Sequence, residues 1–336
     1  MAHIFRWDLD KTYLATEFDT LTDLLKTAFQ SAEEKRNIPG TAALMRELRH
    51  DPEGRTNQIY VVSGSPRQMR KVLLKKLRLD GVEVDKLTLK PNLKNIFLGR
   101  FRAVRDQLGY KLPVLLESRC RVGTTPRETC FGDDAEMDAL IYRLYSDICA
   151  RRVDAAYLEQ IMDAARIYDD QKERIRAAVE DLPVHDPVQR IFIHLDLGSP
   201  TERFVPLGPR VAPTFNSFQA AVILFVDGEL TLQSVQTVAS DMCANYGYNV
   251  LKLQNSLLDV VRRGLAKRGE LQDVISGLEL SLPAGDLDTA ALVEQAVDYV
   301  ALLEEVRAYR RMRHSKRDRI LGVLAGDDKE ILVCQA

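Results

Sequence analysis

Two carboxylates, Asp8 and Asp10, lie two positions apart directly after a short apolar run near the N-terminus. In an extended backbone the side chains of residues i and i+2 point to the same side, so both carboxylates could hold one divalent cation. Acidic pairs of this spacing also occur in ordinary solvated loops, so the pair alone does not identify a site. Its meaning depends on the polar groups that follow other apolar runs.

Further polar groups follow two more apolar runs of the chain. They are Ser63 and Gly64 after residues 59–62, Lys111 further along, and Asp133, Asp134 and Asp138 after residues 128–131. A serine hydroxyl and backbone N–H groups can hold a phosphate oxygen, and a lysine can neutralise one. The carboxylates of Asp8, Asp10 and Asp133 would repel a phosphate unless a divalent cation lay between them, and Mg²⁺ prefers such oxygen ligands. The pattern therefore predicts a site for Mg²⁺ and a phosphate group.

Strand-like and helix-like segments alternate through about residue 150. Short apolar runs at residues 3–9, 59–62, 85–89, 128–131 and 188–195 predict strands, and segments at 23–30, 41–49, 67–79, 95–108, 112–119 and 135–150 predict helices. This alternation is typical of a parallel sheet with right-handed crossovers, in which functional groups lie at the carboxyl ends of the strands. We therefore expect an α/β fold with a Rossmann-like parallel sheet that brings the polar groups together.

Two domains are expected. Residues 1–212 would form the α/β domain, with a helical insertion at about 150–187, and residues 213–336 would form a helical accessory domain. Residues 200–213 contain several prolines and glycines and are predicted to be a loop. The helical segments that follow, at 215–226, 232–267 and 289–313, carry broad apolar stripes that must be buried against something. We favour docking against the α/β domain, because the last predicted strand leaves only a short connection before these helices.

The segment Asp8-Leu9-Asp10-Lys11-Thr12 resembles the first motif, D-x-D-x-T, of the haloacid dehalogenase-like (HAD) superfamily of phosphohydrolases with an aspartate nucleophile. Ser63 resembles the second motif of that superfamily, Lys111 the third, and residues 132–138 the fourth. The resemblance covers roughly residues 3–145 and implies a HAD-like core with a phosphatase site.

The resemblance also implies a role for each matching residue. Asp8 would be the nucleophile, Asp10 the general acid and base, and Thr12 a hydroxyl that stabilises the turn. The substrate would be bound by Thr12, Ser63, Gly64 and Lys111, the Mg²⁺ ion by Asp8, Asp10, Asp133 and Asp134, and Asp138 would orient Lys111. Which of Asp133 and Asp134 contacts the ion directly stays open.

Within this superfamily, two segments resemble the catalytic domain of the actin-patch type of phosphatidate phosphatase. They are Val61-Val62-Ser63-Gly64-Ser65-Pro66 and the run from Gly132 to Tyr142. The chain departs from that pattern where Gly64 interrupts the serines, where Asp134 replaces a serine, and where Ala139 and Leu140 replace a proline and a glutamate. The resemblance implies phosphatidate or another bulky phosphate as substrate.

Composition narrows the classes of protein. The formal net charge of −2 excludes a globally basic nucleic-acid binder. The five cysteines form no C-x-x-C pair, and no apolar run is long enough to span a membrane, so we expect a cytoplasmic protein with reduced thiols. The one dense basic run, Arg307–Arg319, is a candidate contact for anionic lipid or nucleic acid.

Two alternatives to a small-molecule or lipid phosphatase stay open. A nucleic-acid-end phosphatase would need the basic run to face the site. A binding or scaffold protein could keep the fold without turnover, although Asp8, Asp10 and Ser63 are all retained.

Overall fold

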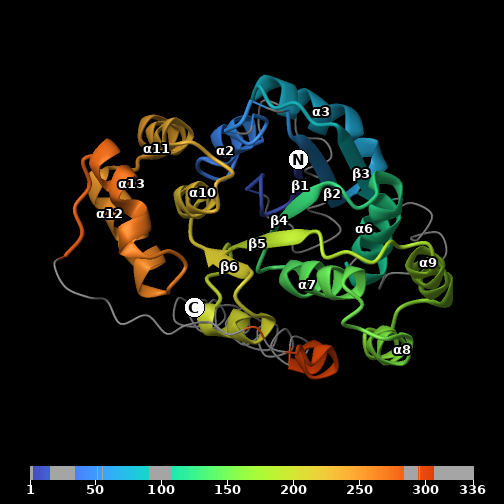
Figure 1. Cartoon of the computed structure of the whole chain (residues 1–336). Coiled ribbons are helices and arrows are strands. Elements are labelled where there is room, and N and C mark those ends of the chain that lie inside the picture. The colour runs from blue at the N-terminus through green and yellow to red at the C-terminus, as the bar shows by residue number, and fades with distance from the viewer. Residues whose placement is uncertain are drawn as a thin grey trace, which may run out of the picture. The chain divides into compact units, whose positions relative to one another are not determined.

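Six parallel strands form the central sheet of the computed structural model, in the order β3-β2-β1-β4-β5-β6 (Figure 1). They span His3–Trp7 (β1), Gln58–Pro66 (β2), Lys86–Lys90 (β3), Arg127–Asp133 (β4), Val188–His194 (β5) and Val211–Thr214 (β6). The structure describes residues 3–15, 35–50, 52–54, 56–90, 107–283, 294 and 296–305. The expected α/β fold with a Rossmann-like parallel sheet is confirmed.

Strand β1 lies inside this sheet, because the chain adds strands first on one side of β1 and then on the other. The chain runs from β1 outward through β2 to β3, then returns to the other side of β1 with β4. All five residues of β1 are buried, as expected for a parallel strand covered on both faces. Trp7 stacks on Phe131 of β4 at 3.9 Å, and Phe131 stacks on Phe192 of β5 at 5.0 Å between ring centroids. In parallel α/β sheets, ligands bind at the carboxyl ends of the strands where the strand order reverses, which is here beside β1.

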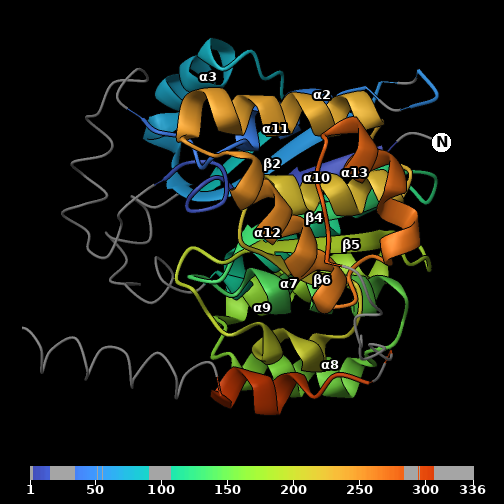
Figure 2. The same cartoon turned by 90° about the vertical axis from the view of Figure 1, so that its left-hand side faces the viewer.

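Helices cover both faces of the sheet (Figures 1 and 2). The helices of the first part of the chain are α2 (Thr41–Glu47), η1 (Arg67–Met69), α3 (Arg70–Leu79), α6 (Leu108–Val122), α7 (Asp138–Cys149), α8 (Ala155–Ala164) and α9 (Asp169–Glu180). Those of the second part are η2 (Thr201–Leu207), α10 (Ser217–Val226), α11 (Leu232–Tyr246), α12 (Val250–Arg262), η3 (Arg268–Leu271) and α13 (Gln272–Gly277). Helices α6 and α7 pack on one face, and α2 and α10 lie on the other.

The chain divides into two compact units. The first contains residues 1–153 and 168–295, and the second residues 154–167 and 296–336. Within the second unit, the Tyr157 hydroxyl accepts a hydrogen bond from the backbone N–H of Tyr299 at 2.9 Å. Within the described ranges, no helix is both long and apolar enough to cross a membrane.

The helices after β6 share one apolar core with the sheet, as the docking expectation required. Phe218, Val222 and Ile223 of α10 are fully buried in the cluster that also holds Phe5 and Trp7 of β1. Because α10–α13 belong to the first unit, the predicted boundary between residues 212 and 213 does not separate two compact units, and that expectation is corrected.

The predicted loop at 200–213 was also wrong, because it contains η2 and most of β6. Pro213 has no N–H for a sheet hydrogen bond and so argued against a strand, yet proline is tolerated on the edge strand of a sheet. The predicted insertion at 150–187 does hold helices, α8 and α9. The helix predicted at 23–30, most of that at 95–108, most of that at 289–313, and the basic run 307–319 lie outside the described residues.

Candidate active site

Asp8 directly follows the last residue of β1, at the carboxyl end of the sheet and at the strand where the strand order reverses. Its side chain is fully buried, and neither carboxylate oxygen accepts a hydrogen bond from any described residue. The Lys111 ammonium approaches Oδ1 at 3.0 Å as an ion pair. A buried carboxylate without hydrogen-bond donors is costly and therefore marks a position that serves a bound group.

The chain after Asp8 folds back in a tight turn. The backbone N–H groups of Tyr13 and Leu14 both donate to the carbonyl of Leu9, at 3.0 and 2.8 Å. Lys11 adopts a left-handed conformation with φ of 60°, which a non-glycine residue adopts only where its surroundings require it. Within the same turn, the Thr12 hydroxyl donates to Oδ2 of Asp133 at 3.4 Å, a long hydrogen bond that links the first and fourth motifs.

This turn places the Asp10 carboxylate against the carboxyl end of β2. Oδ2 of Asp10 accepts hydrogen bonds from the hydroxyls of Ser63, at 2.9 Å, and Ser65, at 2.8 Å. Oδ1 of Asp10 is buried and has no partner among the described residues. Gly64 lies between the two serines, and a Cβ there would lie 2.7 Å from the side-chain nitrogen of Gln107, so a side chain larger than hydrogen would displace Gln107. One hydroxyl-lined end of β2 thus fixes one oxygen of Asp10 and leaves the other available.

Lys111 connects the first motif with the fourth. It lies in the first turns of α6 and is fully buried. Its ammonium donates to Oδ1 of Asp138 at 2.5 Å and to Oε2 of Glu136 at 2.9 Å, in addition to its ion pair with Asp8. Burial alone would lower the pKa of Lys111, but Asp138, Asp8 and Glu136 together raise it well above its ordinary value. Lys111 is therefore a fixed positive charge.

The fourth motif forms a compact acidic turn at the end of β4. Oδ1 of Asp133 accepts hydrogen bonds from the backbone N–H groups of Ala135, at 2.7 Å, and Glu136, at 2.9 Å. Asp138 then folds back beneath the strand. A Cβ at position 132 would lie 2.4 Å from Cβ of Asp138, so only glycine fits there.

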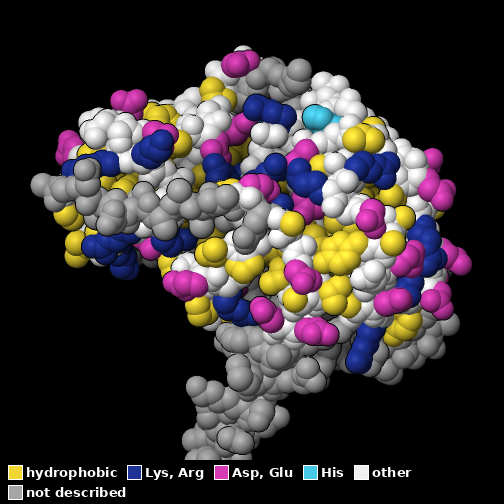
Figure 3. All heavy atoms as spheres, turned by 60° about the horizontal axis from the view of Figure 1, so that its bottom comes forward, with side chains coloured by type: hydrophobic (Ala, Val, Ile, Leu, Met, Phe, Trp, Pro, Cys, Tyr) yellow, Lys and Arg dark blue, Asp and Glu magenta, His cyan; other side chains and the backbone are white. Residues whose placement is uncertain are grey.

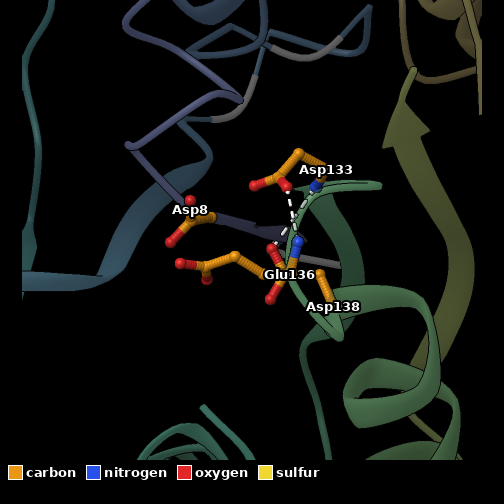
Figure 4. A group of neighbouring side chains, drawn as sticks. All are labelled: Asp8, Asp133, Glu136 and Asp138. Carbon is orange, nitrogen blue, oxygen red and sulfur yellow. Dashed lines mark hydrogen bonds between the residues drawn. The ribbon is translucent and has the colours of Figure 1, made fainter. Parts of the chain in front are cut away.

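Four carboxylates from two segments converge at this point: those of Asp8, Asp133, Glu136 and Asp138 (Figure 4). One oxygen of each lies within 4.8 Å of the others. Lys111 contacts Asp8, Glu136 and Asp138, and its single positive charge cannot offset four carboxylates. A hard divalent cation fits this set of oxygen ligands, and Asp8 and Asp133 are the best placed to hold it, because Asp8 lacks donors and Asp133 makes no ion pair with Lys111 among the described contacts.

Burial, followed by the crowding of negative charge, raises the pKa values of the acidic groups. Burial raises the pKa of Asp8 well above its ordinary value, Lys111 opposes this, and Asp138 and Glu136 add to it. Burial, Asp138 and Glu136 likewise raise the pKa of Asp133 well above its usual range. Burial raises the pKa of Asp138 to about 6 despite its contact with Lys111. Burial also raises the pKa of Asp10, although the hydroxyls of Ser65 and Ser63 act against it.

The structure separates Asp134 from this cluster. Its two carboxylate oxygens accept hydrogen bonds from the backbone N–H groups of Leu197 and Ser199, both at 2.8 Å. Asp134 therefore anchors the loop that follows β5, and its assignment as a metal ligand is corrected. Of the two neighbours, Asp133 lies in the carboxylate cluster and Asp134 does not.

Glu136 is the cluster residue that the sequence analysis missed. Its Oε1 accepts a hydrogen bond from the Gln107 amide at 2.8 Å, and its Oε2 contacts Lys111. The available signal was its position three residues after Asp133, in a turn that returns it to the strand end. Asp8, Asp10, Ser63, Lys111, Asp133 and Asp138, by contrast, lie together as the sequence predicted.

No protein-family model, curated protein or solved structure matches this chain. The chemistry of the site therefore has to be inferred from its geometry, its charges and the motif pattern of the sequence.

Proposed function

We propose that this protein is a Mg²⁺-dependent phosphatase that hydrolyses phosphomonoesters through an aspartyl-phosphate on Asp8. The observation that carries the proposal is the Asp8 carboxylate, which is fully buried, accepts no hydrogen bond from the described residues, and faces the Lys111 ammonium at 3.0 Å. Such a carboxylate has its lone pairs free for attack, and the neighbouring cation would draw a phosphate group toward it.

In the first half of the reaction, an oxygen of Asp8 forms a bond to phosphorus while the bond from phosphorus to the leaving oxygen breaks. Asp10 donates its proton to that leaving oxygen. Burial supports this role, because a raised pKa keeps the Asp10 carboxyl protonated at a higher pH than usual. The hydroxyls of Ser63 and Ser65 hold Asp10 in place through its Oδ2.

In the second half, the ionised Asp10 takes a proton from a water molecule, whose oxygen attacks phosphorus. The bond between phosphorus and Asp8 breaks, so that inorganic phosphate leaves and the Asp8 carboxylate is restored. Lys111 holds a positive charge beside Asp8 throughout, and Asp138 and Glu136 position its ammonium. A Mg²⁺ ion held by Asp8 and Asp133 would neutralise the phosphate oxygens during both steps.

The identity of the substrate belongs to the same proposal. Phosphatidate or another bulky phosphate is suggested by the motif resemblance at residues 61–66 and 132–142.

A cytoplasmic location is proposed from the cysteine pattern, and the four cysteines that the structure describes are free thiols. The contact of Arg307–Arg319 with anionic lipid or nucleic acid also stays a proposal.

The test compares wild-type protein with Asp8→Asn and with Asp273→Asn, an exposed aspartate of α13 that serves as the matched control. Each is assayed in Mg²⁺ against p-nitrophenyl phosphate, phosphatidate, a nucleoside monophosphate, a sugar phosphate and a 5′-phosphorylated oligonucleotide. We expect hydrolysis by the wild type and by D273N, and none by D8N. Full activity in a folded D8N variant would remove Asp8 as nucleophile, and wild-type inactivity on every compound would favour a binding protein.

A further inference from the structure

A cavity of about 290 Å³ lies on the α6 side of the edge strand β3, between β3, α6 and the start of α9. Lys86, Thr88 and Lys90 alternate along β3, so the strand directs the three side chains to one face. Tyr110 and Glu117 of α6 are two helical turns apart and form the opposite wall. The cavity is therefore built from regular elements.

Positive charge dominates the lining of this cavity. The five cations are Arg67, Lys86, Lys90, Arg121 and Arg174, and the two acids are Glu117 and Asp170. Arg174 forms an ion pair with Glu117 at 2.7 Å, and the two charges neutralise each other. Burial first, and then Arg121 and Arg6, lower the pKa of Lys86, and Glu117 acts against them.

The inner wall carries a polar group that lacks a partner. Tyr110 is 6% exposed, and its hydroxyl makes no hydrogen bond with any described residue. The Lys90 ammonium lies 5.5 Å from the centroid of the Tyr110 ring, and Lys90 is 1% exposed. A buried hydroxyl without a partner points to a group that none of the described residues supplies.

Three residues of the cavity lining are close neighbours, in sequence or in strand register, of segments that carry the candidate active site. Tyr110 precedes Lys111, which contacts Asp8. Arg67 directly follows Pro66, the last residue of the strand that carries Ser63, and Lys90 is the register partner of Pro66. Residues next to those of the candidate site, along the chain or across a strand pair, therefore line the cavity.

We propose that this cavity binds a second phosphate group of the substrate, so that the enzyme selects bisphosphorylated compounds over phosphatidate and other monophosphates. The proposal rests on the phosphatase function and specifies its substrate class. A phosphate carries between one and two negative charges near neutral pH and offers several acceptor oxygens, which suits the Tyr110 hydroxyl and an excess of cations. The volume lies just below the range for sites that hold a whole small molecule, about 300 to 1,000 Å³, so it suits one compact group.

The experiment uses α,ω-alkanediol bisphosphates of three to eight carbons, each paired with the monoalkyl phosphate of the same length. We expect the bisphosphate of best length to exceed its partner about tenfold in kcat/KM, mainly through KM, as one charged hydrogen-bonded contact provides. Lys86→Gln and Arg121→Gln should each reduce that ratio several-fold. Lys71→Gln, which removes an exposed lysine of α3 outside the cavity, should leave the ratio unchanged.

Binding to the D8N variant separates this proposal from the phosphatase proposal. If no probe is hydrolysed, the phosphatase proposal fails, and calorimetry on D8N still tests whether bisphosphates bind more tightly than monophosphates and whether Arg121→Gln removes the difference. Equal kcat/KM and equal affinity for both members at every chain length would overturn the cavity proposal. A preference that survives both Lys86→Gln and Arg121→Gln would overturn it as well, and Arg121, being exposed, can be replaced without disturbing the core.

Discussion

Removal of one buried charge beneath the candidate active site, through Glu128→Gln, should destabilise the protein strongly. Glu128 of β4 is fully buried and binds Arg6 of β1 through two hydrogen bonds, at 2.6 and 2.7 Å. It also accepts hydrogen bonds from Arg119 of α6, at 3.1 Å, and from the Tyr145 hydroxyl of α7, at 2.8 Å. This cluster joins four elements, among them the strand that directly precedes Asp8 and the helix that carries Lys111.

The glutamine variant keeps the shape of residue 128 but removes its negative charge. The buried guanidinium groups of Arg6 and Arg119 then have no carboxylate partner among the described residues. Breaking a buried ion pair by removal of one partner costs about 3–5 kcal/mol of unfolding free energy. The measurement is urea unfolding followed by circular dichroism at pH 7. The control is Glu117→Gln, which breaks the more exposed pair with Arg174 and should cost about 0–1 kcal/mol.

The pH dependence of the unfolding free energy provides a second measurement for this prediction. Burial alone would raise the pKa of Glu128, but Arg6 and Arg119 outweigh it and hold the pKa below its ordinary value. Because the folded pKa lies below that of the unfolded chain, the stabilisation is complete above the unfolded value, about 4.3, and is lost as the pH falls through the folded value. The difference between wild type and E128Q should therefore shrink below about pH 4. An unfolding free energy that is equal for both proteins at pH 7 would refute the reasoning.

Four further predictions concern the site and its support. Asp8→Asn should lower kcat by several orders of magnitude while the circular dichroism spectrum stays unchanged, and a folded variant with near wild-type turnover would contradict the mechanism. EDTA should abolish hydrolysis and Mg²⁺ should restore it, whereas Zn²⁺ should restore it poorly at a site of oxygen ligands; activity indifferent to EDTA would count against a metal. Gly132→Ala should place a methyl group against Asp138 and lower stability by about 1–3 kcal/mol together with kcat, and unchanged thermal unfolding would show that the turn can adjust. A chain that ends at Pro213 should aggregate, because loss of α10 exposes the apolar face that it covers, and a soluble, cooperatively folding fragment would show that the shared core is dispensable.

The alternation of apolar strands and amphipathic helices was sufficient to predict the parallel sheet, because burial on both faces requires continuous apolar runs such as β1. It was insufficient for β6, because the proline of Val211-Ala212-Pro213-Thr214 is compatible with an edge strand as well as with a loop. The broad stripe on α10 predicted burial but not the partner, since any apolar surface satisfies an apolar stripe.

In the candidate site, sequence spacing specifies some contacts, and the backbone conformation of the turn after β4 decides the others. Asp8 and Lys111 could be paired from their places at strand and helix ends, and the structure brings them to 3.0 Å. Asp133 and Asp134 are neighbours, and the backbone of the turn after β4 sends one to the cluster and the other to residues 197–199. The conformation of that turn also returns Glu136 to the site, and sequence spacing alone does not specify it.

The reversal of strand order at β1 has a consequence for how the protein matures. Residues 8, 63, 111 and 133 meet only after β1 has been flanked by β2 on one side and by β4 on the other. Contacts between residues so distant in sequence form late in folding, because the loops between them must close first. A chain still emerging from the ribosome therefore carries Asp8 long before it carries Lys111 and the acidic turn. Under the proposed mechanism, hydrolytic competence should appear in a single step, only after β4 has joined the sheet, and not in stages as the chain lengthens.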